Sequence, residues 1–252
     1  MVYAVSDIHG HLREFESALE KVGFGDGDFL YVLGDAIDRG PDSLGVVKKI
    51  RQMENAALLK GNHEALAEEY LRAALKWAEK TGAPLDRYSN PRLPWEWACN
   101  GGMLTFAQLY HLPTEEVEDF LGYLEGLPLV GLIKEGEREY VLTHSGPYKG
   151  EKDEGFVYSK SLSLREAEDL VWSSPFREDE YAPVEEYPEG KTSVFGHVPV
   201  ARIGKDKCFC FQSGGRVLLD IDGGMALNSP FVSKLTVANL TEFDVETVEM
   251  EL

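Results

Sequence analysis

The sequence predicts an α/β fold in one domain, with parallel strands in its first part and a mixed sheet arrangement toward its end. In the first 80 residues, short apolar segments alternate with amphipathic segments. This order is typical of parallel strands joined by helices that cover the sheet. The last third contains mainly strand-like segments, and the 252 residues are 43% hydrophobic. That composition is sufficient for one large core.

The alternating part contains three apolar runs of strand length. We predict strands at residues 2–6, 29–33 and 56–60. We predict helices after them at residues 11–22, 41–53 and 64–80. The first helix places Leu12, Phe15 and Leu19 on one face. Pro41 opens the second helix, a position where proline is tolerated.

The part of the chain after residue 100 is predicted to contain both helices and strands, without the regular alternation of the first part. Helices are predicted at residues 101–110, 114–126 and 163–172. The last of these begins with Ser163 and Glu166, which fit a capping box. The remaining strands are predicted at residues 128–133, 138–143, 192–196, 207–211, 216–221, 234–240 and 243–250.

Composition limits the classes of partner. The chain has 25 Lys and Arg residues against 44 Asp and Glu residues, a formal net charge of -19, which disfavours nucleic acids and anionic membranes. Three cysteines, Cys99, Cys208 and Cys210, argue against a disulfide framework. We expect the last two on one face of a strand. Because neither a signal peptide nor an apolar run of ~20 residues is found, we expect a cytoplasmic protein.

Polar side chains follow five of the predicted strands at the point where each strand ends. They are Asp7 and His9, then Asp35, Asp38 and Arg39, then Asn62 and His63, then His144, and finally His197. Ligand sites in open α/β sheets lie at the carboxyl ends of the strands, so the five loops are expected to converge. A single D-x-H motif or a single histidine is more often structural. The complete ordered set indicates a functional site.

The donor types indicate a site for two divalent metal ions. Carboxylate, imidazole and carboxamide groups suit Mn²⁺, Fe or Zn²⁺ better than Ca²⁺ or a thiolate-bound ion. Asp35 lies in the middle motif and is the natural bridging carboxylate. Two ions ~3.5–4 Å apart can share and acidify one hydroxide and hold it for in-line attack.

The motifs "DIHG", "GDAIDRG", "GNHE", "THSG" and "GHVP" occur in this order. The ordered set resembles the phosphoprotein phosphatase family of the calcineurin-like metallophosphoesterases, and its bacterial and phage branch in particular. This resemblance implies a four-layer fold in which helices flank a central mixed β-sandwich.

The resemblance also implies roles for individual residues. The first metal is expected on Asp7, His9 and Asp35, and the second on Asp35, Asn62, His144 and His197. Asn62 is expected to contact substrate as well. Mn²⁺ is the expected metal, with Fe or Zn²⁺ as alternatives. Asp38 would raise the pKa of His63, which would protonate the leaving group, while Arg39 would bind phosphoryl oxygens.

Two positions depart from the family pattern. Ser174 stands where phage-type relatives carry an arginine, and Arg177 is the candidate to replace that phosphate-binding residue. The family motif I-D-T-G appears as "IDGG", with Gly223 in place of threonine, which leaves a role for Asp222 open.

The segment 81–97 interrupts the α/β pattern with three prolines and two tryptophans. We favour simple packing of its aromatic residues against the domain. The alternative is a lid whose Tyr88, Trp95 or Trp97 touches substrate. The glycines of "NGG" at 100–102 are expected to serve the backbone rather than the chemistry.

The sequence therefore predicts one metallophosphoesterase domain over residues 1–252 that hydrolyses phosphoserine or phosphothreonine in proteins. A symmetrical dinucleoside tetraphosphate hydrolase is the alternative, because that class shares the motifs. A nucleic-acid phosphodiesterase is less favoured, since Pro199 stands where such enzymes carry a histidine ligand. An inactive metal-bound scaffold is also less favoured, because the motif residues are intact.

Overall fold

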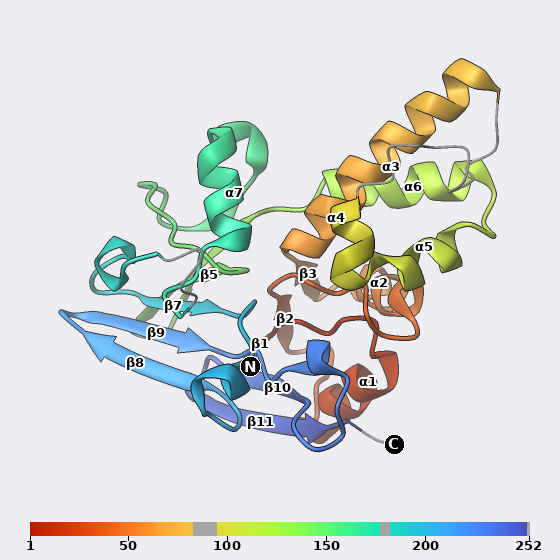
Figure 1. The fold of residues 1–252 in the computed structure, drawn as a ribbon. Coiled ribbons are helices and arrows are strands. Elements are labelled where there is room, and N and C mark those ends of the chain that lie inside the picture. Colours follow the sequence, from red (N-terminus) through yellow and green to blue (C-terminus); the bar gives the residue numbers. More distant parts are fainter. Residues whose placement is uncertain (83–94, 177–181, 251–252) are drawn as a thin grey trace.

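The computed structural model describes residues 1–82, 95–176 and 182–250 (Figure 1). Two β-sheets form its centre, with strand orders β11-β10-β1-β2-β3 and β6-β4-β5-β7-β9-β8. The first sheet consists of β1 (Val2–Val5), β2 (Phe29–Val32), β3 (Ala56–Leu58), β10 (Lys234–Asn239) and β11 (Asp244–Glu249). The second consists of β4 (Val130–Glu135), β5 (Arg138–Thr143), β6 (Gly155–Val157), β7 (Thr192–Phe195), β8 (Phe209–Ser213) and β9 (Arg216–Asp220).

Parallel pairing is found where the strand–helix alternation predicted it. β1 pairs in parallel with β2, and β2 with β3. β10 and β11 join that sheet in antiparallel fashion. In the second sheet β5, β7 and β9 are parallel, while β4, β6 and β8 are antiparallel to their neighbours. Both sheets are therefore mixed.

Helices cover the outer faces of the two sheets. The helices are α1 (Leu12–Lys21), α2 (Ser43–Gln52), α3 (Asn62–Thr81), α4 (Trp95–Trp97), α5 (Met103–Leu109), α6 (Thr114–Glu125) and α7 (Leu164–Trp172). A buried cluster joins α1, α2, α3, α5 and α6 to the first sheet, and a separate one joins α7 to the second. In Figure 1, α7 lies on the opposite side of the molecule from α1 and α2.

The two sheets share an apolar core between them. Leu33 and Leu59, which follow β2 and β3, pack in one cluster with Leu142 and Val194 of β5 and β7. The buried hydroxyl of Tyr140 on β5 donates to the carbonyl of Leu240, directly after β10, at 2.7 Å. The expected four-layer arrangement, with helices outside a central mixed β-sandwich, is confirmed.

The structure differs from the sequence predictions in local detail. Strand β6 was not predicted, because three residues after an acidic, glycine-containing segment give no readable alternation. The predicted strand at 207–211 begins two residues later, at Phe209. The predicted helix at 101–110 is a π-helical turn at 98–102 followed by α5. The capping box of Ser163 and Glu166 at α7 is confirmed.

The structure agrees with the expectation for the cysteines, that they form no disulfide framework. The three cysteines are free, and Phe209 packs against Phe176 with ring centroids 5.0 Å apart. Among the residues with described positions, no helix combines the length and the apolar character needed to cross a membrane.

Candidate active site

The predicted site residues lie in the loops that follow β1, β2, β3, β5 and β7. Their backbone conformation is unusual. Eight non-glycine residues in the described part of the chain have a positive φ. Six of these eight are predicted site residues, namely Asp7, His9, Asp35, Asp38, Arg39 and His197. Left-handed backbone in non-glycine residues is strained and concentrates at functional sites.

Asp35 occupies the centre of the site. Its Oδ2 atom lies 3.7 Å from Nε2 of His9, 3.8 Å from Nε2 of His63 and 3.5 Å from Nε2 of His144. Its other oxygen, Oδ1, accepts the backbone N–H of His63 at 3.1 Å. One carboxylate oxygen is thus held by the backbone of α3, while the other faces three imidazoles.

The imidazoles are oriented by hydrogen bonds to the backbone. Nδ1 of His9 donates to the carbonyl of Ile37 at 3.0 Å, and Nδ1 of His144 donates to the carbonyl of Leu33 at 2.9 Å. This arrangement fixes the tautomer and leaves the Nε2 lone pair of each ring directed toward Asp35. Metal-binding histidines are commonly held in this way.

A second group of donors forms around Oδ1 of Asn62 and shares His144 with the first. Oδ1 of Asn62 is 2.9 Å from Nε2 of His144 and 3.0 Å from Nδ1 of His197. The two imidazole nitrogens are themselves 3.2 Å apart. Donor atoms bound to one ion by bonds of about 2.1 Å lie about 3 Å apart, so these three side chains are spaced as ligands of one metal.

Asp7 links the first and fifth loops. Its Oδ2 accepts the hydroxyl of Ser6 at 2.5 Å and the backbone N–H of His197 at 2.9 Å. Its Oδ1 lies 3.8 Å from Nε2 of His9. The structure therefore brings together all six residues that the resemblance implied as metal ligands.

The donor set fits two divalent ions that share Asp35. Ligand atoms within 4.8 Å of one another form the groups His9, Asp35 and His63, and Asp35, His144 and His197. His63, expected only as an acid, belongs to the first group. Burial, the largest effect, raises the pKa of the Asp35 carboxyl and lowers the pKa of His9. A bound cation would favour the carboxylate and the neutral imidazole, the forms that bind metal.

Glu64 holds the loop that carries Asp35, a role that the sequence did not reveal. Its fully buried carboxylate accepts the backbone N–H groups of Asp35 at 2.8 Å and Ala36 at 2.9 Å. It also accepts the N–H of Gly61 at 2.9 Å and, more weakly, that of Ile37 at 3.4 Å. The glutamate of the "GNHE" motif is thus the only available signal for this contact.

Asp38, His63 and Arg39 form a connected row at the edge of the metal-competent cluster. Nδ1 of His63 donates to Oδ2 of Asp38 at 2.7 Å. Nε2 of the same ring accepts from Nη2 of Arg39 at 3.1 Å. Asp38 and His63 are fully buried, whereas Arg39 is half-buried and can meet a ligand from solvent.

The electrostatics of this row correct one expectation. Burial, followed by the charge of Arg39 and then His144, lowers the pKa of His63 well below its ordinary value. The net change in the pKa of His63 is therefore downward in the protein alone, opposite to the increase expected from the Asp38 carboxylate. Burial also raises the pKa of Asp38 to about 7, against the hydrogen bonds from Thr105 and Trp97 and the charge of Arg39.

The departures from the family pattern are placed as follows. Ser174 is fully buried, and Arg177 lies outside the described residues. Asp222 is fully buried near Asp7, and its Oδ2 atom has no hydrogen-bond partner in the described structure. A Cβ on Gly223 would lie 2.3 Å from the carbonyl oxygen of Lys234, which explains the absence of threonine.

The predicted insert at 81–97 is only partly described. Trp97 is fully buried and packs on Tyr70 with ring centroids 5.1 Å apart, whereas Trp95 is 82% exposed. Trp97 therefore packs within the domain, as favoured from the sequence. Tyr88 lies outside the described residues.

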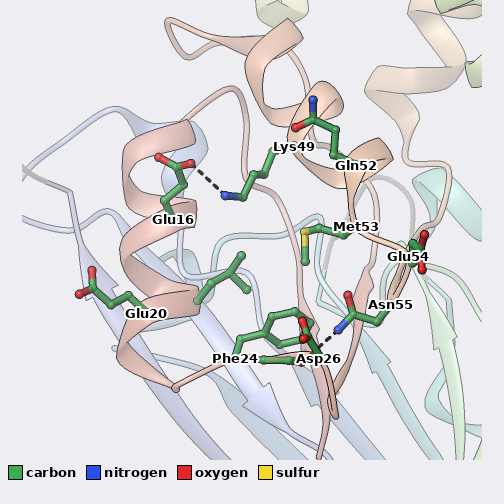
Figure 2. Close-up of a pocket in the computed structure, with 11 residues that line it drawn as sticks. Glu16, Glu20, Phe24, Asp26, Lys49, Gln52, Met53, Glu54 and Asn55 are labelled. Carbon is green, nitrogen blue, oxygen red and sulfur yellow. Dashed lines mark hydrogen bonds and ion pairs between the residues drawn. The ribbon is translucent and has the colours of Figure 1, made fainter.

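A cavity of about 850 Å³ lies away from this cluster, between α1 and α2 (Figure 2). Its acidic and apolar lining residues include Glu16, Glu20, Asp26, Glu54, Leu19, Phe24 and Met53. Lys49 pairs with Glu16 at 3.1 Å. The segments at 24–26 and 53–55 precede β2 and β3, so the cavity opens at the amino ends of these strands. The metal-competent groups lie at the opposite ends.

Comparisons with known proteins agree with this geometry. The family profile for the calcineurin-like phosphoesterases matches residues 1–212. A symmetrical bis(5'-nucleosyl)-tetraphosphatase of Chromohalobacter salexigens is 32% identical over 57% of this chain and 44% of its own length. Serine/threonine-protein phosphatase 2 of Escherichia coli is 30% identical over 68% of this chain and 66% of its own length. The chain thus spans less than half of the tetraphosphatase.

Solved structures share the fold. A candidate diadenosine tetraphosphatase superposes with a TM-score of 0.63 at 21% identity, over 99% of this chain and 93% of its own. A serine/threonine phosphatase of Saccharomyces cerevisiae superposes with a TM-score of 0.57 at 14% identity, over 100% of this chain and 80% of its own. The resemblance to the phosphoprotein phosphatases is confirmed, and the chain belongs to the calcineurin-like phosphoesterase family.

Proposed function

We propose that this metallophosphoesterase hydrolyses phosphate monoesters, with phosphoserine and phosphothreonine in proteins as its substrates. The observation that carries the proposal is the row formed by Arg39, His63 and Asp38 beside the metal-competent cluster. Such a row can hold a phosphoryl group and supply a proton to the oxygen that leaves it. We also propose that residues 1–252 form one domain, which the core shared by both sheets supports.

The proposed metal ligands are Asp7, His9, Asp35, Asn62, His144 and His197, with Asp35 shared. Two divalent ions, Mn²⁺ in the first instance, would polarise the phosphoryl oxygens and lower the pKa of bound water. Hydrogen bonds to the backbone orient the imidazole ligands His9 and His144 before substrate arrives. The net charge of -19 supports substrates other than nucleic acids.

Arg39 is proposed to exchange partners when substrate binds. Without substrate, its Nη2 atom donates to Nε2 of His63. A phosphoryl oxygen is a stronger, charged acceptor and would draw the guanidinium away. That exchange frees Nε2 of His63, and the negative charge of the phosphate raises the pKa of the imidazole. Substrate binding thus counteracts the lowered pKa of the buried ring.

The acid is proposed to act on the leaving oxygen. Once Arg39 has moved, Nε2 of His63 takes up a proton from solvent. As water adds to phosphorus, the bond from phosphorus to the serine oxygen breaks, the proton on Nε2 passes to that oxygen, and the proton released by the water goes to the phosphate product or to solvent. An alkoxide is strongly basic and needs this proton, whereas a nitrophenolate or a nucleotide leaves without it. A buried acid pair therefore favours alkyl phosphates over dinucleoside polyphosphates.

A dinucleoside tetraphosphate remains the second candidate substrate. Several tetraphosphatases from Buchnera and other bacteria are 40–45% identical to this chain, but over only 25% of its length. The E. coli protein phosphatase matches 68% of the chain. The Chromohalobacter tetraphosphatase matches 57% of the chain at 32% identity, so the comparisons support both substrates, and the acid pair is what favours the phosphoprotein.

Two measurements test this proposal. Mn²⁺-loaded protein should hydrolyse a phosphoserine peptide faster than diadenosine tetraphosphate, and the reverse preference would transfer the assignment to the second candidate. His63→Asn should lower turnover of the peptide by about 10²–10⁴-fold, with a clearly smaller loss on p-nitrophenyl phosphate. His111→Asn, on an exposed histidine, is the matched control. Equal losses on both substrates with metal retained would contradict the acid assignment.

A further inference from the structure

Trp97 makes a direct contact with the buried acid pair. Its indole N–H donates to Oδ2 of Asp38 at 2.7 Å, and the side chain is fully buried. The same oxygen accepts Nδ1–H of His63, also at 2.7 Å. The other oxygen of Asp38 accepts the hydroxyl of Thr105 at 2.5 Å. The carboxylate is thus held by donors from α3, α4 and α5.

The hydrogen bonds around Thr105 are mutually consistent. Its single hydroxyl hydrogen is used on Asp38, so its oxygen accepts from the hydroxyl of Ser43, 2.9 Å away. The oxygen of Ser43 in turn accepts the backbone N–H of Asp38 at 2.9 Å. This ring of three residues holds one carboxylate oxygen of Asp38, Oδ1, whereas the other oxygen, Oδ2, depends on Trp97 and His63.

The backbone around Trp97 is shaped for this contact. A Cβ on Gly102 would lie 2.3 Å from Nε1 of Trp97, and one on Gly101 would lie 2.6 Å from Cγ of Arg39. Gly101 has a φ of 100° within the π-helical turn. Its carbonyl accepts the backbone N–H of Arg39 at 3.2 Å, and the carbonyl of Asn100 accepts Nε of Arg39 at 3.1 Å. One turn therefore positions both Asp38 and Arg39.

We propose that Trp97 is a positioning residue for catalysis: its indole N–H fixes the Asp38 carboxylate so that His63 presents Nε2 to the leaving oxygen. This inference rests on the proposed function. A carboxylate that loses one donor can rotate about its broad χ2 minimum, and the bonded imidazole moves with it. Misplacement of a catalytic group by 1 Å can lower the rate about 10²-fold.

Packing alone would predict a different outcome. Trp97 contacts Tyr70, which also contacts Phe106 at a ring-centroid distance of 5.6 Å, so the indole also fills the core. A packing role depends on ring shape and affects all substrates equally. A positioning role depends on the N–H group and affects substrates according to the basicity of their leaving groups.

The test compares Trp97→Phe with wild type in Mn²⁺-loaded protein. We expect kcat on a phosphoserine peptide to fall about 10–100-fold, with a clearly smaller fall on p-nitrophenyl phosphate. KM and metal content should be unchanged. Trp77→Phe, on a half-buried tryptophan of α3, should leave both rates unchanged. Adding Trp97→Phe to Asp38→Asn should cause little further loss, since the residues act as a unit.

The outcomes separate this inference from the proposed function. If His63→Asn shows the leaving-group dependence and Trp97→Phe does not, the positioning role of Trp97 is overturned while the acid remains. If neither variant shows it, both proposals fail. Should Trp97→Phe not fold, benzothienylalanine at position 97 keeps the ring shape without the N–H. The expected result is the same selective loss, and unchanged kinetics would overturn the inference.

Discussion

Replacing Glu64 by glutamine tests whether the loop that carries Asp35 is held by a buried charge. Glu64 accepts four backbone N–H groups, two on each carboxylate oxygen. A glutamine has only one side-chain acceptor oxygen. Its least costly orientation keeps the bonds to Asp35 and Gly61 and turns an NH₂ group toward the N–H groups of Ala36 and Ile37.

The magnitude follows from the bonds that are lost. Glu64→Gln removes one good charge-assisted bond, to Ala36, and the weaker one to Ile37. A hydrogen bond to a charged group contributes about 1.5–3 kcal/mol, and the two retained bonds become neutral and weaker. Burial opposes this loss, since it raises the pKa of Glu64 and makes the buried charge costly. We expect a net loss of about 2 kcal/mol, about a 30-fold change in the folding equilibrium.

Urea unfolding of the chelated protein measures the stability, and Mn²⁺ titration measures the site. Because the amide of Asp35 is one of the retained but weakened contacts, Mn²⁺ affinity should fall about 10–100-fold. Glu69→Gln, on an exposed residue one helical turn and a half further along α3, should change stability by less than about 0.5 kcal/mol. Wild-type stability and metal affinity in Glu64→Gln would refute the reasoning.

Three further predictions concern the site itself. Wild-type protein reconstituted with Mn²⁺ should bind about two ions per chain by elemental analysis. Asp35→Asn should weaken both, and tight binding of two ions in that variant would rule out a shared ligand. Arg39→Ala should keep its metal but lose about 10²-fold or more in kcat/KM. The control variant Arg165→Ala, on an exposed residue of α7, should keep its wild-type kcat/KM. Normal kinetics for Arg39→Ala would place the guanidinium away from substrate. In chelated protein the folded state holds the proton of Asp38 up to about pH 7, whereas the unfolded chain releases it near pH 4. The stability that this group contributes is therefore present below about pH 4 and lost as pH rises toward 7. Between pH 5 and pH 8, the free energy of unfolding measured in urea should fall by about 3 kcal/mol more for wild type than for Asp38→Asn. An equal pH dependence of the two proteins would show that Asp38 does not titrate in this window.

The sequence was sufficient to predict the order of the main elements, except β6, and the residue types of the site. Asp35 and His144 could be predicted because each directly follows an apolar strand, and the carboxyl ends of parallel strands meet. The contacts that hold these residues could not be predicted in the same way. Trp97 and Thr105 lie 59 and 67 positions from Asp38, and no sequence periodicity connects them.

The degree to which Asp38 and His63 are shielded from solvent also could not be predicted from the sequence. The spacing of Asp38 and His63 indicates a pair, and the pair is present. Its electrostatics depend on how deeply the pair is buried and on the guanidinium of Arg39 beside it. Desolvation reverses the expected pKa change of His63. A sequence motif therefore predicts which groups meet more reliably than it predicts their protonation.

The strained backbone of the site explains why distant contacts matter. A left-handed conformation costs a non-glycine residue about 1 kcal/mol or more, so six of them together oppose folding by an amount comparable with the net stability of a typical domain. Each of the six N–H groups is hydrogen-bonded. The acceptors are Gly34 for Asp7, Asp35 for His9, Glu64 for Asp35, Ser43 for Asp38, Gly101 for Arg39 and Asp7 for His197. Five of these acceptors lie in a different loop or helix more than 25 positions away, and only Ser43 is close in sequence to its donor. The loops therefore stabilise one another's strained conformations, and the residues that supply these acceptors are as necessary to the site as its metal-competent side chains.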